Sequence, residues 1–348
     1  EISDGLVNEN MLSLLEDREG SIWLGTYGGG VQRFIKGSCL TLATREGLAG
    51  NVIRSFAEDS SGALWIATNN NGVNVFPRGA RTPKLIDKTR TKTLAGDEIR
   101  GMHIDADGSV WIGIVGGGVQ HFAGGKWRRY TVSDGLPSND VYAITRDKAG
   151  ALWFSTSERG IARLEKGRFT RYGLAEGLAN ESVYALLADV RGGLWLGTFG
   201  GGAQYYADGR WRTYNVGNGL LGNNILCFYQ SADSAVWIGG VGGISRIKNG
   251  VVRTLTKREG LFDESAFAIV ADEMGRLWAS CNKGVYSFRK SEADSVLDGH
   301  KKTLVCRSFG VADGMRSPEC NGGAQPSGLK TKDGRLWFAS IEGAVVFD

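Results

Sequence analysis

Long hydrophobic runs are absent from this sequence, and histidine is scarce. No run approaches the ~18 consecutive apolar residues that a membrane-spanning helix needs, so no span is expected within these residues. The three histidines, His103, His121 and His300, lack zinc-ligand spacing. No G-x-S-x-G, P-loop or dinucleotide fingerprint appears between a strand and a helix. The sequence therefore predicts no metal, no cofactor and no catalytic site, so we expect this chain not to be an enzyme.

The sequence also has no large excess of charge of either sign. The net charge is +4, from 41 basic and 37 acidic residues, which is weak for a nucleic-acid binder. Basic residues gather at positions 78–100 and 301–307. These stretches are either solvated loops or contacts for an anionic ligand or partner. The five cysteines are odd in number and form no C-x-x-C, so they leave the cellular compartment open.

What the sequence does contain is a repeat, D-x-x-G-x-[LIV]-W. Successive repeat tryptophans lie 41–46 residues apart, except for a last gap of 59. A period in the low forties indicates one supersecondary unit that is copied and stacked. The repeat tryptophans are Trp23, Trp65, Trp111, Trp153, Trp195, Trp237, Trp278 and Trp337.

One copy, residues 177–214, predicts four short strands at 183–188, 194–198, 203–206 and 211–214, separated by glycine-rich turns. Four antiparallel strands in about 42 residues are typical of a β-propeller blade. We expect each Asp-x-x-Gly to form a hairpin turn and each repeat tryptophan to wedge between blades. The sixth copy has Ser231 and Ser234 in place of Asp and Gly, and the eighth has Thr331 in place of Asp. Residues 291–302 are an insertion that we expect to form a loop.

The copies predict an all-β fold, a single propeller domain over residues 1–348 that is a fragment of a longer protein. Eight blades closed in a ring is the first expectation, and seven blades plus an incomplete one is the alternative. The repeats run roughly over 4–45, 46–92, 93–133, 134–175, 176–217, 218–258, 259–312 and 313–348.

Candidate ligand-binding residues come from two loops of each blade, because function usually lies on loops held by a rigid scaffold. The loop that enters the innermost strand reads G-L-x-x-[N/D/E], and its fifth position predicts a polar ring near the axis: Glu9, Asn51, Asp97, Asn139, Glu181, Asn223 and Glu264. These side chains serve either a polyhydroxylated ligand or the backbone of their own loops.

The loop between the second and third strands varies more between copies and offers positions for specificity. Tyr27 and Phe199 suit stacking on a sugar ring, and Arg159 and Lys283 suit a carboxylate or sulfate. Asn70 lies in the same loop of the second copy.

The combined frame resembles a known family. Segments such as GLAGNVIRSFAEDSSGALWIATNNNGV and GLPSNDVYAITRDKAGALWFSTSERGI are similar to the two-component regulator propeller repeat. The resemblance covers essentially the whole chain and implies the periplasmic sensor region of a bacterial transmembrane protein. In the family the output is usually a histidine kinase and sometimes a diguanylate cyclase. The family has no universal binding motif, so the resemblance assigns no site residue.

The predicted function is therefore extracytoplasmic ligand sensing, with a carbohydrate or sugar acid as the input. The expected partners are that ligand, downstream signalling domains of the same chain and a second copy of the chain, with no nucleic acid and no membrane contact by this fragment. A protein–protein interaction or dimerisation propeller is the alternative. A polysaccharide lyase or hydrolase is the third hypothesis.

Overall fold

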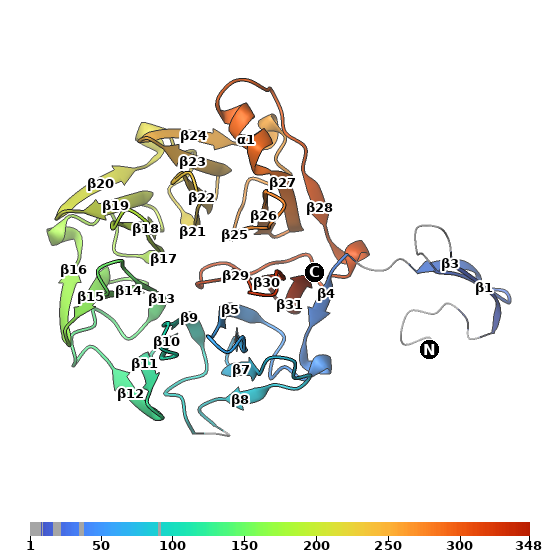
Figure 1. Ribbon diagram of the computed structural model, residues 1–348, viewed down its shortest axis with the longest axis horizontal. Helices are drawn as coiled ribbons and strands as arrows, with labels where there is room; N and C mark the ends of the chain where they lie inside the picture. Colours follow the sequence, from blue (N-terminus) through green and yellow to red (C-terminus); the bar gives the residue numbers. More distant parts are fainter. Residues whose placement is uncertain (1–7, 9, 17–21, 35–37, 90–91) are drawn as a thin grey trace.

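The structure is a computed structural model that describes residues 8, 10–16, 22–34, 38–89 and 92–348. Its strands form eight antiparallel sheets. Seven of these close into a ring and one lies beside it (Figure 1). The outlying sheet has three strands, β1 (Met11–Glu16), β2 (Ile22–Thr26) and β3 (Gly30–Phe34).

The ring consists of four-stranded blades whose innermost strands surround a central axis (Figure 1). Six blades use consecutive strands: β5 (Ile53–Glu58), β6 (Leu64–Thr68), β7 (Val73–Phe76), β8 (Lys84–Ile86); β9 (Ile99–Ile104), β10 (Val110–Ile114), β11 (Gly118–Ala123), β12 (Lys126–Tyr130); β13 (Val141–Arg146), β14 (Leu152–Thr156), β15 (Ile161–Glu165), β16 (Arg168–Tyr172); β17 (Val183–Ala188), β18 (Leu194–Thr198), β19 (Ala203–Ala207), β20 (Arg210–Tyr214); β21 (Ile225–Gln230), β22 (Val236–Gly240), β23 (Ile244–Lys248), β24 (Val251–Leu255); β25 (Ala268–Ala271), β26 (Arg276–Cys281), β27 (Gly284–Arg289), β28 (Arg307–Phe309).

The last blade closes the ring by borrowing a strand from the other end of the sequence. It contains β29 (Gly328–Lys330), β30 (Leu336–Ser340) and β31 (Gly343–Phe347), and its outer strand is β4 (Leu40–Leu42). Val345 pairs with Thr41 in this antiparallel ladder. All eight repeats form sheets as predicted, but the expectation of an eight-bladed ring is corrected to the seven-bladed alternative. The reason is that the fourth strand of the first repeat is used in the last blade.

The repeat tryptophans hold neighbouring blades together, as predicted. Trp195 is 2% exposed and packs with Ile225 and Val236 of the next blade. Trp337 packs with Ile53 and Phe56, so the same contact also joins the last blade to the blade that begins with β5. Each blade of the ring therefore buries its apolar face against its neighbour, which is the physical reason for the repeat.

The aspartate of D-x-x-G-x-[LIV]-W has two roles. One oxygen of Asp59 accepts hydrogen bonds from the backbone of Ser61 and Ala63 in the hairpin turn, as expected of an Asx turn. The other accepts a hydrogen bond from Trp65 Nε1 at 3.2 Å. The corresponding indole bonds go from Trp111 to Asp105, Trp153 to Asp147, Trp195 to Asp189 and Trp278 to Asp272.

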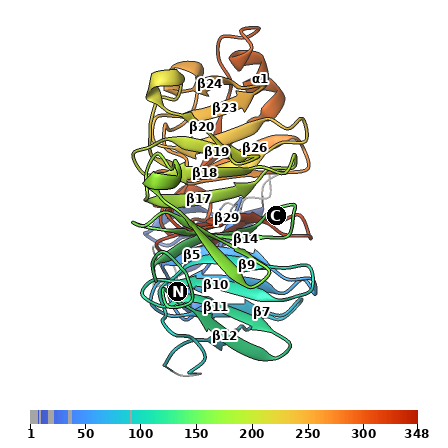
Figure 2. The ribbon, with the colours of Figure 1, turned by 90° about the vertical axis from the view of Figure 1, so that its left-hand side faces the viewer.

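The insertion in the seventh repeat is not entirely a loop, which corrects that expectation. Its first part forms α1 (Lys290–Leu297), which lies at the outer rim beside β24 and β27 (Figure 2). Ala293, Val296 and Leu297 are buried, so an apolar helix face covers the rim of the blade. Among the described residues, no helix is long and apolar enough to cross a membrane.

Candidate functional site

The innermost strands carry a β-bulge at the same position in blade after blade. In β5, Ile53 pairs with Thr68 and Ser55 pairs with Ala67, so Arg54 has no partner across the ladder. The same interruption falls at Arg100, Tyr142, Tyr184 and Leu226. A bulge turns its extra residue away from the regular alternation of the strand, and bulges are common beside functional sites.

The bulged side chains meet one another around the axis. The Arg100 guanidinium lies 5.4 Å from the centre of the Tyr142 ring. Tyr142 and Tyr184 form an edge-to-face pair with ring centres 5.0 Å apart. Arg54 Nη1 lies 3.5 Å from the Asn321 side-chain oxygen, across the joint between the last blade and the blade of β5. We call Arg54, Arg100, Tyr142, Tyr184 and Asn321 the axial cluster.

The axial cluster carries an excess of positive charge. Glu98 accepts hydrogen bonds from Arg100, at 3.0 Å to Nε. Arg54 donates instead to the neutral amide of Asn69, at 3.2 Å. Burial and the nearby charge of Arg100 lower the pKa of the Arg54 guanidinium. Two guanidinium groups therefore face one carboxylate, an arrangement that an anionic ligand would stabilise.

A loop of the last blade, residues 320–327, spans the ring next to the axial cluster (Figure 1). The backbone N–H of Gln325 donates to the carbonyl of Arg100, and its side-chain oxygen accepts from the N–H of Leu186 at 2.7 Å. The carbonyl of Pro326 accepts from the N–H of Phe56 at 2.9 Å. This loop therefore connects the last blade to three others at the axis. A molecule bound at the axial cluster would lie against it.

Most of the predicted polar ring stabilises loops. The side chains of Asn51, Asn139, Asn223 and Glu264 each accept a hydrogen bond from the backbone N–H seven residues earlier. Asp97 accepts from the N–H of Lys88 at 2.7 Å. A carboxylate oxygen of Glu181 lies against Gly173. This is the backbone role that the sequence also allowed. Glu9 lies outside the described residues.

The predicted second-loop residues are spread over different blades. Phe199 contacts the axial cluster, with its ring centre 5.7 Å from that of Tyr184. Lys283 forms an ion pair with Asp263 at 3.0 Å. Tyr27 is 70% exposed on the outlying sheet. Asn70 adopts a left-handed backbone conformation in its turn, and the N–H of Arg159 donates to Thr156. Their role in ligand binding remains a prediction.

Sequence reasoning missed the bulged positions, although a signal was present. Three residues after the ring positions from Asn51 to Glu264, the chain reads Arg54, Arg100, Tyr142, Tyr184, Leu226 and Phe267. Strand alternation alone does not show which way these side chains point, because the bulge sets their direction.

The histidines and cysteines do not assemble a second chemical site. His103 Nε2 lies 3.0 Å from Asp105, and His121 stacks on Trp111 with ring centres 3.7 Å apart. All five cysteines are free thiols, and burial raises the pKa of Cys227 to about 12. The described residues contain no group of three or more His, Cys, Asp or Glu able to hold a metal ion.

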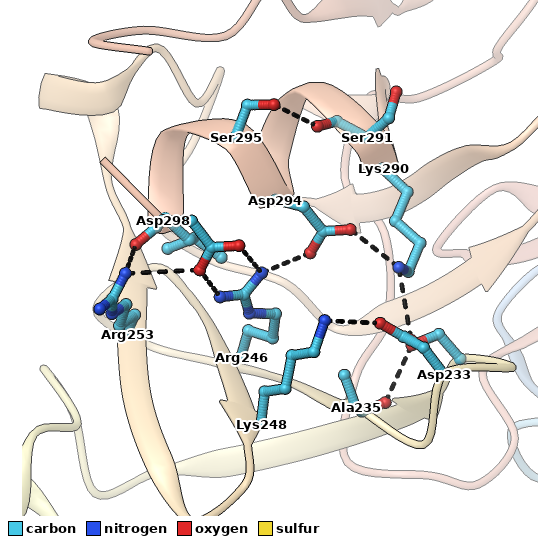
Figure 3. Close-up of polar contacts among 12 residues, drawn as sticks. Asp233, Ala235, Arg246, Lys248, Arg253, Lys290, Ser291, Asp294, Ser295 and Asp298 are labelled. Atoms are coloured by element: carbon cyan, nitrogen blue, oxygen red, sulfur yellow. Dashed lines mark hydrogen bonds and ion pairs between the residues drawn. The ribbon is translucent and has the colours of Figure 1, made fainter. Parts of the chain in front are cut away.

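A second polar cluster, beneath α1, ties the insertion to the neighbouring blade (Figure 3). Arg246 is 3% exposed and donates to Asp294 and Asp298, each at 2.5 Å. Lys290 bridges Asp294 at 2.8 Å and Asp233 at 3.4 Å. The carboxylates of this cluster are matched by cations within it. Its arrangement therefore accounts for how α1 is held in place.

Comparison with solved structures establishes the fold. The extracellular domain of a protein assigned as a hybrid two-component system from B. thetaiotaomicron is 24% identical, with a TM-score of 0.82 over 99% of this chain and 46% of that one. A second such domain from B. thetaiotaomicron, assigned to a one-component system, is 20% identical, with a TM-score of 0.71 over 98% and 46%. The chain thus spans less than half the length of these two domains.

A virginiamycin B lyase from Staphylococcus aureus is also similar in fold. It is 16% identical, with a TM-score of 0.65 over 89% of this chain and 97% of the lyase. No curated protein matches the sequence.

The sequence itself identifies the repeat. Residues 5–28, 47–70, 135–158 and 177–200 match the family model described as two component regulator propeller. Three of these segments lie in blades of the ring, and the first contributes to the outlying sheet. Four repeats of this chain therefore match the two-component regulator propeller repeat.

Proposed function

We propose that this chain is a ligand-sensing domain on the extracytoplasmic side of a bacterial transmembrane signalling protein, and that it responds to an acidic carbohydrate. The fold neighbours include extracellular domains of proteins assigned to two-component and one-component systems. The axial cluster supports this class of ligand, because it brings arginines and tyrosines together at one place. The output is proposed to lie in signalling domains of the same protein.

The chemistry of the axial cluster matches a sugar acid. A guanidinium group binds a carboxylate through two parallel hydrogen bonds. Among the described residues, Arg54 has no carboxylate as a hydrogen-bond partner. Tyrosine offers an apolar ring face together with a hydroxyl, which suits a polar ring that also has C–H surfaces. Phe199, one of the predicted stacking residues, extends this aromatic surface beside Tyr184.

Signalling requires that the ligand bind two arrangements of the protein with different affinity. The closed ring favours a rigid-body response over the opening of blades, because every blade packs on both neighbours. The loop at residues 320–327 offers a place for this difference to arise. It contacts three blades at the axis and belongs to the last blade. A second copy of the chain is a natural partner for such a rearrangement.

A thermal-shift screen tests the proposal. Trigalacturonate is compared with the neutral trisaccharides cellotriose and maltotriose, for the wild type and for Arg54→Gln and Arg54→Lys. We expect a saturable rise in melting temperature of a few degrees with trigalacturonate only, lost in Arg54→Gln and reduced in Arg54→Lys. Arg168→Gln, which changes an exposed arginine at the start of the outer strand β16, is the control. A flat response to trigalacturonate, or an equal response to neutral sugars, would contradict the acidic ligand.

A polysaccharide lyase is a second candidate because a lyase shares the fold. One assay distinguishes a lyase from a sensor, since a lyase releases unsaturated sugar products that absorb ultraviolet light. A sensor leaves the oligosaccharide intact.

A further inference from the structure

A cavity of about 610 Å³ lies at the seam where the last blade meets the blade of β5. Its volume falls in the range of small-molecule sites, ~300–1,000 Å³. The wall on one side is the connection between β7 and β8, residues 77–83. In the blades of β9, β13, β17 and β21, the equivalent connection has only two residues. The connection at this seam is therefore longer than in those four blades, and we call the space beside it the seam cavity.

The floor of the seam cavity is apolar. Leu64 and Phe76 line it from one blade, and Leu42 and Trp337 line it from the other. The strand that closes the ring thus contributes to the cavity. Trp337 is 5% exposed, so its ring is fixed by packing and offers a rigid surface.

The carboxylates at the rim are already engaged. Glu46 pairs with Arg316 at 2.5 Å, and Glu58 accepts a hydrogen bond from the N–H of Lys332 at 2.8 Å. Asp333 accepts from the Thr331 hydroxyl at 2.6 Å. By contrast, Arg78 and Arg81 line the cavity and form no ion pair with any residue that the structure describes.

Thr331 removes a further negative charge. In five other blades this position is an aspartate that accepts a hydrogen bond from the repeat tryptophan. Here Trp337 Nε1 donates to the neutral Thr331 hydroxyl at 3.3 Å. The cavity therefore has an apolar floor, two arginines that pair with no carboxylate of the described residues, and a neutral side chain where the repeat normally places a carboxylate.

From these observations we infer that the seam cavity binds a small amphipathic anion. Its apolar ring or short chain would pack on Phe76 and Trp337, and its carboxylate or sulfonate would pair with Arg78 and Arg81. This site is separate from the axial cluster and does not depend on the sensing function proposed above. It gives a role to the basic stretch that begins at Arg78.

Isothermal titration of the full chain with 2-naphthoate, and with its neutral analogue 2-naphthylmethanol, tests this inference. We expect 2-naphthoate to bind more tightly, and the double variant Arg78→Gln/Arg81→Gln to weaken it roughly tenfold or more while binding of the alcohol stays the same. The matched control is Arg168→Gln/Arg210→Gln, which changes two exposed arginines at the short connections of other blades.

A second variant adds charge instead of removing it. Thr331→Asp restores the aspartate found at this position in five other blades. Its spacing from Asp333 matches that of Asp105 and Asp107, so we expect the melting temperature to stay the same. The added negative charge should weaken naphthoate binding. Ser231→Asp is the matched control, because it makes the same change two residues before Asp233 in a blade remote from the cavity. The inference is overturned if both anion and alcohol bind equally, or if neither the arginine pair nor Thr331→Asp changes naphthoate binding. It is also overturned if Arg54→Gln abolishes that binding, since the probe would then occupy the axial cluster.

Discussion

At the scale of single residues, the D-x-x-G-x-[LIV]-W repeat is explained by one aspartate that serves two neighbours. It fixes the hairpin through backbone N–H groups and satisfies the indole of a buried tryptophan. The sixth copy shows the consequence of losing it, because Ser231 replaces the aspartate and Trp237 Nε1 has no hydrogen-bond partner in the part of the chain that the structure describes. In the same turn Ser234 takes the left-handed backbone conformation that glycine takes in the other blades of the ring.

Replacing Asp189 should therefore destabilise the ring through Trp195. The Asp189 side chain is fully buried and accepts from Trp195 Nε1 at 2.9 Å. Asp189→Ala leaves this buried indole N–H unsatisfied, which should lower the free energy of unfolding by about 1–3 kcal/mol. Asp189→Asn keeps one acceptor and should cost less. Urea unfolding measures both variants, and equal stability of Asp189→Ala and the wild type would contradict the role assigned to the aspartate.

His121 should make stability depend on pH. Burial lowers the pKa of this imidazole, which stacks on Trp111. Because its folded pKa lies below the unfolded value of about 6.5, the unfolded chain binds the proton more readily. Stability from this group is present above that value and is lost as the pH falls through it towards the folded pKa. In melting curves from pH 7.5 to 5, the melting temperature of His121→Phe should fall less than that of the wild type. The exposed His300→Asn should behave like the wild type. A loss unchanged in His121→Phe would exclude this histidine as the cause.

At the scale of elements, the sequence predicted the strands well and their closure less well. The predicted strands at 183–188 and 194–198 coincide with β17 and β18, because alternation and turn residues are local signals. The strand that completes the last blade cannot be predicted from local signals, since β4 and β31 are about 300 residues apart in the chain. The repeat period gives the number of repeats, but it does not show which strands join to close the ring. For the same reason the axial cluster could be identified only after the bulges were seen.

Two truncations test the closure by β4. A chain that begins at Ser38 loses β1 to β3 but keeps β4, and should melt at nearly the temperature of the full chain. A chain that begins at Thr44 also loses β4 and leaves the edge of β31 unpaired, beside buried Val345 and Phe347. We expect this second chain to melt several degrees lower or to aggregate. Equal melting temperatures for the two truncated chains would contradict closure by β4.

At the scale of the whole molecule, the ring sets two different environments apart. The axial cluster gathers side chains from several blades at the centre, whereas the seam cavity lies between two blades at the joint of the ring. Outside the ring, β1 exposes Met11, Leu12, Leu14 and Leu15, each more than 60% accessible. An exposed apolar strand of this kind favours an interaction partner, which keeps the interaction alternative open beside sensing. These separate surfaces explain why fold alone does not determine function here.

The central claim is that an acidic oligosaccharide binds at the axis of the ring. Hydrogen exchange with and without saturating trigalacturonate tests it most directly, with cellotriose as the neutral control. With trigalacturonate, we expect slower exchange confined to the axial segments 54–56, 100–102, 142–144, 184–186 and 321–327, and we expect no change with cellotriose. Slower exchange confined to the outer strands or to residues 77–83, or no change with either sugar, would contradict it.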